Sequence, residues 1–514
     1  MSIFTKVKMR KPKKSGFNLS HEVKLSCNFG ELIPILVQEA LPNDTFRHKS
    51  EVLCRFAPLL APIMHRVNIY THYFFVPNRL IWDEWEKFIS MDYSESDKPI
   101  HPHFFNNPIS QNIIQKGSVG DYLGLPTSTD SKAALGQISA LPFRAYNLIY
   151  NEYYRDETIQ PERYLNTSSG MDIYLGNYDT LARRAWEKDY FTSALPFPQA
   201  GGDVHIKLGE SAPINPTKTP PVFRVNGGET GASEVFHSAD RGVGDLADSK
   251  GRTLYFEESG LEADLSNSKG TTIRDFRRAN KLQEWLEKNA TAGRRYVEQL
   301  FAHFGQKSQD SRLQRPEYLG GNKVPVVISD VPQTSQSTDT SAQATLAGNA
   351  TSLYEDNGFK YNCPEHGYII GIMSVLPRTA YQDGIPKMFL RDDTFDYAFP
   401  TFANIGEQEI KNKELFVTGT EKDDETFGYA PRYSEYKYVP SRVAGDFRDN
   451  LSFWHLGRQF KKLPTLSPEF IQCNHENLSR IFAVEDGAED KLWIQVFNDT
   501  RATRCLPYFG TPQL

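Results

Sequence analysis

The chain of 514 residues has few cysteines and no long apolar run. Its five cysteines are odd in number and lie far apart, which argues against a disulfide framework and a paired-thiolate zinc site. The basic N-terminus is not followed by the apolar segment of a signal peptide, and no later run is long enough to span a bilayer. We therefore expect free thiols in a reducing cytoplasm, without secretion or membrane insertion.

Catalytic and metal-binding motifs are also scarce. The glycine-rich stretch at 226–234 lacks the Lys-Ser/Thr of a phosphate loop, so a solvated turn is the better interpretation. His21 has Leu25, and not a second histidine, four residues later, which excludes a metalloprotease helix. Cys363 and His366 could ligate a metal but have no partner pair nearby. We predict no metal site.

Pairs of carboxylates are the remaining candidates for catalysis. Glu84 with Glu86, or Asp392 with Asp393, could act as acid and base across a sugar bond. With 64 acidic residues in the chain, such pairs arise by chance, and a solvated surface is the preferred interpretation. We predict no catalytic residue and no cofactor.

Positive charge is concentrated at the start of the chain, although the net charge is −6. Residues 1–16 are poor in large apolar groups, so we expect a disordered arm until an anion binds it. Clustered cations displace counterions from a phosphate backbone, which favours nucleic-acid binding over a solubilising tail. The candidate nucleic-acid-binding residues are Lys6, Lys8, Arg10, Lys11, Lys13 and Lys14.

Alternating residues predict a strand at 67–76, and further strands are expected at 367–376 and 491–497, both bounded by turn or Pro-containing segments. After the first of these, Asn78 is a candidate cap for a short helix. Its apolar side chains recur at helical spacing, and they are Ile81, Trp82, Trp85, Phe88 and Ile89. With 35 glycines and 31 prolines along the chain, we expect a β-sandwich or jelly roll with long loops.

Helical periodicity is clearest at 273–304, where a break near Gly293 predicts two helices in a hairpin. Shorter amphipathic helices are expected at 144–154 and 181–190. Two polar segments, 203–268 and 333–352, have the composition of insertions.

Aromatic residues alternate with proline in four segments, at 73–79, 194–199, 397–402 and 505–510. Such segments suit contacts with neighbouring surfaces, but packing of loops within the domain explains them equally well. Composition leaves both interpretations open.

Long ordered strings of the chain resemble the major capsid proteins of microviruses, in particular the gokushovirus-like branch. The resemblance covers most of the chain outside the two polar segments. It departs at 348–350, where Gly-Asn-Ala replaces the Gly-His-Gly of the family. The strings that carry it are FNLSHEVKLSCNFGELIPI at 17–35, RFAPLLAPIMHRVNIYTHYFFVPNRLIWDEWEKFI at 55–89, YNEYYRD at 150–156, AWEKDYFTSALPFPQ at 185–199, SRLQRPEYLGG at 311–321, VPVVISDV at 324–331, EHGYIIGIMSVLPRTAYQDGIPKMF at 365–389 and FGYAPRYSEYKYVPSRVAGDFR at 427–448.

This resemblance implies a mainly β protein, an eight-stranded viral jelly roll with large loop and helical insertions. A basic arm (1–16) would precede a single capsid domain (17–514). Within that domain we assign 203–268 to a surface protrusion at the threefold axes, 270–320 to a helical insertion and 333–352 to a polar loop.

The resemblance also implies partners. Copies of the chain, as pentamers and then as a simple (T=1) icosahedral shell in the virion, would enclose a circular single-stranded DNA genome. Assembly would take place in the bacterial host cytoplasm, with other phage structural or scaffolding proteins. The insertion at 203–268 would contribute to attachment to a host receptor, and its excess of acidic over basic residues would keep it away from the genome.

Two other classes fit the composition. An aromatic-rich β-sandwich can be a carbohydrate-active enzyme, which would need a cleft with two placed carboxylates. It can also be a receptor-binding module, which would stay small in solution. Electron microscopy of the expressed protein distinguishes both from a shell protein.

Overall fold

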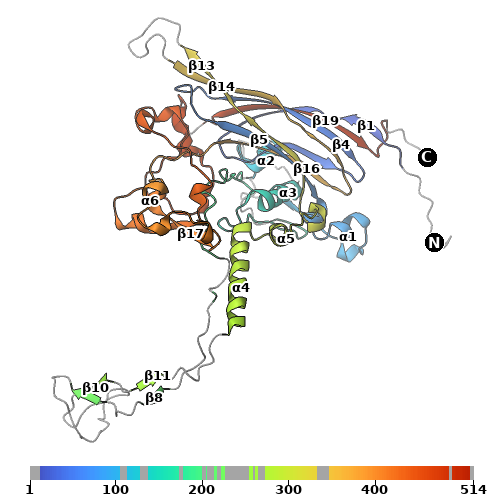
Figure 1. Ribbon diagram of the computed structural model, residues 1–514. Coiled ribbons are helices and arrows are strands. Elements are labelled where there is room, and N and C mark those ends of the chain that lie inside the picture. The colour runs from blue at the N-terminus through green and yellow to red at the C-terminus, as the bar shows by residue number, and fades with distance from the viewer. Residues whose placement is uncertain are drawn as a thin grey trace. The chain divides into compact units, whose positions relative to one another are not determined.

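The computed structural model (Figure 1) divides the chain into two compact units, described here one at a time. The larger unit comprises Met1–Pro198 and Asn289–Leu514, and the smaller comprises Gln199–Lys288. The structure describes residues 12–104, 113–127, 137–172, 178–199, 204, 214–216, 222–225, 254–258, 261–263, 272–332, 346–484 and 489–509.

The first sheet of the larger unit has seven antiparallel strands in the order β1-β19-β4-β14-β13, with β2 also paired to β19 and β15 to β4. Side chains alternate along β4 between buried and exposed, so one face of the sheet lies against the core and the other faces solvent. The strands are β1 Ser15–Asn18, β2 His21–Cys27, β4 Thr45–Phe56, β13 Val327–Pro332, β14 Leu346–Glu355, β15 Phe359–Asn362 and β19 Leu492–Arg504.

The second sheet has four antiparallel strands in the order β12-β5-β16-β3. Its two central strands, β5 and β16, are buried along almost their whole length, because both faces of this sheet are covered. The strands are β3 Ile33–Ala40, β5 Val67–Pro77, β12 Glu317–Pro325 and β16 Gly367–Pro377.

Two apolar layers lie on either side of the second sheet. One fills the space between the two sheets, where Val52 of β4 and Val496 of β19 belong to the same cluster as Ile69 of β5. The other lies under helix α3 (Leu141–Ile149), where Phe143 and Tyr146 join a cluster with strands β5 and β16 (Figure 1). The second sheet is therefore the middle layer of the larger unit.

The remaining elements are short apart from one helix. In the C-terminal third of the chain, strands β17 and β18 pair with each other, and both contribute residues to a small apolar cluster. The helices are α1 Trp85–Ser90, α2 Val119–Tyr122, α4 Ile273–Ala292, α5 Tyr296–Phe304, α6 Asn412–Leu415 and α7 Pro468–Ile471, and the strands are β6 His103–Phe104, β7 Ile138–Ser139, β8 Ile214–Pro216, β9 Val222–Val225, β10 Leu254–Glu258, β11 Leu261–Ala263, β17 Glu407–Lys411 and β18 Thr426–Pro431.

The long periodic patterns were predicted correctly. Strands at 67–76, 367–376 and 491–497 are confirmed as β5, β16 and β19, and the last extends to Arg504. The helix at 144–154 is confirmed as α3, which continues into one π-helical stretch, Tyr150–Tyr154. Helices α4 and α5 confirm the two helices at 273–304, and Gly293 between them has a positive φ of 109°.

The helix predicted at 181–190 is wrong. Backbone groups of this segment bond to other parts of the chain: the Arg184 N–H donates to Gly30, and the Trp186 N–H donates to Ile471. The Arg184 carbonyl accepts from Cys473. Because these groups are used between segments, they are not free for helical hydrogen bonds, and the chain stays irregular.

The short helix expected after Asn78 is confirmed only over Trp85–Ser90, and the predicted cap at Asn78 is wrong. Asn78 lies within a short 3-10 turn, Asn78–Leu80, and its N–H donates to His366. The carbonyl of Ile81 accepts a hydrogen bond from Arg144, and Trp82 is fully buried. The chain therefore turns toward the core before helix α1 begins at Trp85.

Two expected boundaries change. Strand β1 begins at Ser15, so residues 15–16 belong to the first sheet and not to the arm. Residues 346–352 of the expected polar loop form the first part of β14, and residues 333–345 lie outside the described residues. Gly348 lets strand β14 approach the backbone of Ala61 closely, because a Cβ at position 348 would lie 2.4 Å from the Ala61 carbonyl oxygen.

A buried polar network crosses the space between the two sheets. The hydroxyl of Tyr73 donates to Asp356 and lies 2.8 Å from the Ser50 hydroxyl. The two ring nitrogens of His48 lie 2.8 Å from Thr500 Oγ1 and 2.9 Å from Ser50 Oγ. Burial lowers the pKa of His48 to about 4, so the ring is neutral in the folded protein near pH 7.

This network predicts an acid-sensitive fold. As pH falls from about 6.5 to about 4, the unfolded chain protonates His48 while the folded chain does not, so the free energy of unfolding decreases. Between about pH 7 and about pH 5, His48 alone contributes a decrease of about 2 kcal/mol. Urea unfolding at several pH values measures it. The His48→Gln variant should show a smaller decrease over this range, and an unchanged decrease would contradict the assignment.

A buried ion pair joins helix α3 to the following loop. Arg144 and Asp172 have fully buried side chains, with 3.0 Å between Arg144 Nη2 and Asp172 Oδ2. Arg144 also donates to the carbonyls of Ile81 and Ser168, so its guanidinium holds three chain segments together.

Removing the acid of this pair leaves a buried cation without its counter-charge. We expect Asp172→Asn to cost about 3–5 kcal/mol of unfolding free energy. The exposed Lys87–Asp97 pair offers a matched control, since Asp97→Asn should change stability by less than about 1 kcal/mol. Denaturant unfolding of both variants makes the comparison, and equal effects would argue against a structural role for the buried pair.

Candidate functional site

The sequence-predicted arm meets the fold at the edge of the first sheet. Lys6, Lys8, Arg10 and Lys11 lie outside the described residues. Lys13 is exposed, whereas the Lys14 ammonium donates to the backbone carbonyl of Asn43 at 2.6 Å and to its side chain at 2.8 Å. Lys14 therefore fixes the point from which the N-terminal residues leave the sheet.

Three more cations lie on the solvent face of the same sheet. The strand register places Lys360 of β15 opposite Arg47 of β4, and Arg47 opposite Arg501 of β19. Arg501 in turn pairs with Asn18 of β1. Directly opposite residues on one face of a sheet have neighbouring side chains. We call Lys360, Arg47 and Arg501 the cationic row.

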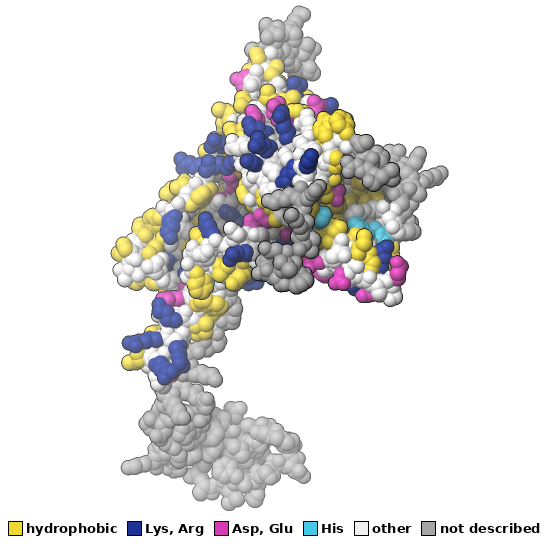
Figure 2. All heavy atoms as spheres, turned by 90° about the vertical axis from the view of Figure 1, so that its right-hand side faces the viewer, with side chains coloured by type: hydrophobic (Ala, Val, Ile, Leu, Met, Phe, Trp, Pro, Cys, Tyr) yellow, Lys and Arg dark blue, Asp and Glu magenta, His cyan; other side chains and the backbone are white. Residues whose placement is uncertain are grey.

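Ion pairs neutralise only part of this surface. Arg504 is held by the buried carboxylate of Asp44 at 3.0 Å, and Arg501 lies 3.8 Å from Asp499. In the described part of the chain, no carboxylate lies within 4.0 Å of Arg47 or Lys360. Figure 2, which views the molecule from the side of the two termini, shows Lys and Arg side chains gathered in the upper part of that view.

Sequence reasoning missed the cationic row because its members are far apart in the chain. Of the three strands that form the row, only β4 carries a sequence pattern that indicates a charged face, because Arg47, Lys49, Glu51 and Arg55 all lie at exposed positions of its alternating pattern. The other two members join the row through strand pairing, which depends on register.

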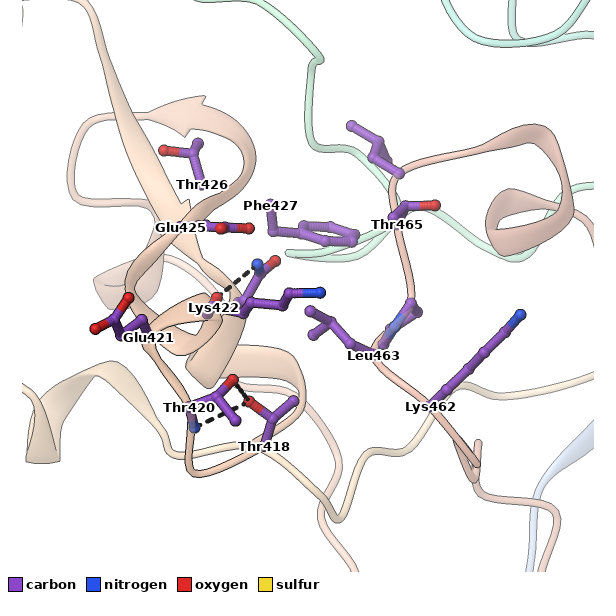
Figure 3. A pocket seen from close by; sticks show the side chains of 13 residues that line it. Thr418, Thr420, Glu421, Lys422, Glu425, Thr426, Phe427, Lys462, Leu463 and Thr465 are labelled. Atoms are coloured by element: carbon purple, nitrogen blue, oxygen red, sulfur yellow. Dashed lines mark hydrogen bonds between the residues drawn. The ribbon is translucent and has the colours of Figure 1, made fainter.

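A surface pocket of about 920 Å³ lies beside β18 (Figure 3). Its apolar wall includes Phe427 and Leu463, and the hydroxyls of Thr418 and Thr420 lie 2.7 Å apart at its polar rim. The nearby carboxylate of Asp423 accepts hydrogen bonds from the side chain and backbone of Thr418, which lower its pKa and make it a weaker base. The side chains that line the pocket offer hydrogen-bond donors to a bound molecule, but they include no activated nucleophile.

The carboxylate pairs have structural roles. Glu84 accepts a hydrogen bond from the Ser169 hydroxyl. Asp393 accepts one from the backbone N–H of Thr394, and the N–H of Asp392 donates to Asp396. Glu84 and Asp393 therefore stabilise local structure through hydrogen bonds.

Among the residues that the structure describes, Cys363 and His366 are not part of a group of metal-binding side chains. Cys363 is buried, which raises the pKa of its thiol to about 12, and the His366 ring packs on Trp85 with 5.5 Å between ring centroids. Within the described ranges, no three His, Cys, Asp or Glu side chains are grouped to hold a metal ion. The glycine-rich stretch at 226–234 lies outside them. Among the described helices, none is both long and apolar enough to cross a membrane.

Comparison with known proteins gives a consistent result over the whole chain. Residues 5–514 match the family described as “Capsid protein (F protein)”. The chain is 37% identical to the “Capsid protein VP1” of Bdellovibrio phage phiMH2K, over 90% of this chain and 88% of that protein. It is 34% identical to the “Capsid protein VP1” of Chlamydia phage 1, over 99% and 97%.

A third relative is the “Capsid protein VP1” of Spiroplasma virus 4, which is 30% identical over 98% of this chain and 95% of its own length. All three alignments cover about nine tenths or more of this chain. The chain therefore belongs to the capsid protein (F protein) family of the Microviridae, single-stranded DNA phages, and it is a major structural protein of the virion capsid and not an enzyme.

Proposed function

We propose that the chain forms a viral jelly roll whose copies close into an icosahedral shell around a single-stranded DNA genome. The pairing of eight strands supports the fold. Taken in chain order, the first strand pairs with the eighth (β2 with β19) and the second with the seventh (β3 with β16). The third pairs with the sixth (β4 with β14), and the fourth with the fifth (β5 with β12).

This nested pairing is that of one long antiparallel ribbon wound into two facing sheets, which is the principle of a jelly roll. The segments between strands are long: helices α1 to α5 lie between β5 and β12, and β17 and β18 lie between β16 and β19. Such segments provide surfaces for contacts with other copies, and closed symmetry then sets the size of the shell.

The shell itself is tested by electron microscopy of the expressed protein. We expect closed particles of uniform diameter with icosahedral symmetry, and pentamers when assembly is incomplete, because each copy would contact neighbours around several axes. A protein that remains monomeric under all conditions, although folded, would contradict the proposal.

For the genome, we infer that the arm and the cationic row bind the phosphates of single-stranded DNA. The observation that carries this inference is the charge on the solvent face of the first sheet: Arg47, Lys360 and Arg501 lie opposite one another on three paired strands, and β1, which follows the arm, joins the same sheet. Binding through phosphates needs no base code, as packaging of a whole genome requires.

Neutralising either part of this surface should weaken DNA binding. We expect the six arm cations changed to Gln, or Arg47→Gln with Lys360→Gln and Arg501→Gln, to lower affinity for single-stranded DNA. The dependence of affinity on salt should also decrease, by about 0.7 in logarithmic slope for each phosphate that the protein no longer neutralises.

The measurement is DNA binding by dissociated subunits at several salt concentrations. Lys422→Gln with Lys437→Gln and Lys462→Gln is the control of equal charge change for the row variant, because these lysines lie on the segments around β18. An equal decrease in binding by this control would show that net charge alone matters, and would contradict a specific site.

Host attachment is proposed for residues 203–268, of which the structure describes mainly the short strands β8 to β11 in the smaller unit. The excess of acidic residues supports a hydrated role away from the genome. A host receptor and other phage structural or scaffolding proteins complete the proposed partners. Deleting 203–268 should preserve shells in electron microscopy while reducing adsorption to host cells; failed assembly of a folded subunit would refute this role.

A further inference from the structure

Large apolar side chains are exposed on a continuous stretch between β16 and β17. Phe389 is 70% exposed, Phe395 58% and Tyr397 55%. Tyr436, from the segment after β18, joins them, because its hydroxyl accepts a hydrogen bond from the Ala398 N–H. We call the following residues the aromatic platform: Met388, Phe389, Phe395, Tyr397, Phe399 and Tyr436.

The platform is held in shape by stacking. The Arg391 guanidinium carbon lies 4.4 Å from the ring centre of Tyr436 and 5.2 Å from that of Tyr397, so it is placed between the two segments. Arg391 also lies 3.9 Å from the carboxylate of Glu435, and both side chains are largely buried. Phe402 packs edge-on against Phe395 and Phe399.

Hydrogen bonds also fix the backbone of this stretch. The Asp396 carboxylate accepts the N–H groups of Asp392 at 2.8 Å and Asp393 at 2.9 Å. The hydroxyl of Tyr433, itself at a positive φ of 63°, accepts the N–H of Phe399 at 3.3 Å. An apolar surface that is rigid before binding loses little conformational entropy when a partner covers it. This is the character of a contact surface and not of a mobile loop.

The charges around the platform limit what can cover it. Among its cations, Arg391 and Lys387 are paired with Glu435 and Glu414, whereas Lys437, which follows Tyr436, is exposed. The other charges at 388–399, those of Asp392, Asp393 and Asp396, are negative. Because these carboxylates repel phosphate groups, single-stranded DNA is a poor partner for this surface.

We propose that the aromatic platform is a subunit interface, buried against a second copy of this chain in the shell. The inference rests on the proposed shell, because a capsid protein must cover surfaces of this kind with its own copies. Interfaces of permanent assemblies have apolar centres enriched in aromatic residues, and five of the six platform side chains are aromatic.

The same reasoning separates two of the four aromatic segments of the sequence. Tyr73, Phe74 and Phe75 in the first segment are almost completely buried, so their role is internal packing. The segment at 397–402 instead presents Tyr397 and Phe399 to solvent. The two interpretations that composition left open therefore apply to different segments.

Methionine oxidation tests the interface in the unmodified protein. Met388 is 57% exposed, and Met91, which directly follows helix α1, is 78% exposed and provides an internal reference for reagent access. Oxidation follows exposure, so Met388 should react about tenfold more slowly in assembled shells than in dissociated subunits. Equal rates of Met388 oxidation in shells and subunits would overturn the interface while leaving the shell itself established. Failure of the unmodified chain to form any shell would contradict both.

A pair of substitutions provides an independent test. Phe395→Ser with Phe399→Ser removes exposed rings, so the subunit should keep its unfolding midpoint while the yield of shells falls sharply in electron microscopy. The control is Phe276→Ser with Leu282→Ser on helix α4, which removes exposed apolar side chains from the unit that contains the proposed protrusion. Normal shell yield from the platform variant would overturn the proposal.

Discussion

The pairing of β19 is the constraint on which the first sheet depends. This last strand lies between the strands at the start of the chain, β1 and β2, and the central strand β4. Without it, β1 and β2 would have no sheet to join, and the cationic row would lack Arg501. Strand β19 is separated from β1, β2 and β4 by almost the whole chain. Pairing it with them costs loop-closure entropy, and the burial of apolar side chains must offset this cost.

The second sheet supplies that burial. It is covered on one face by the first sheet and on the other by α3, so its strands β5 and β16 are buried along almost their whole length. Buried polar groups are stabilised by hydrogen bonds, and in the network around His48 the hydroxyl of Tyr73 in the second sheet donates to Ser50 in the first. The ion pair of Arg144 does the same between α3 and its neighbouring loops.

The surfaces of this core carry different chemistry. The solvent face of the first sheet presents the cationic row, which suits the proposed contact with the genome. The segment between β16 and β17 presents the aromatic platform with paired or negative charge, which suits the proposed contact with another copy. In both places the core holds surface side chains in position for a proposed contact with another molecule, as expected of a shell subunit.

By itself, the sequence determined the elements whose signal is local: the buried strands β5, β16 and β19, the helices around Gly293, the absence of catalytic motifs and the cationic arm. Its long ordered strings also identified the family. Only the tertiary structure decided that 181–190 is irregular, because Arg184 and Trp186 bond to distant segments. It also decided which aromatic segments are buried, and it brought Arg47, Lys360 and Arg501 together. These features depend on strand register and on contacts between distant residues, which no local pattern of residues specifies.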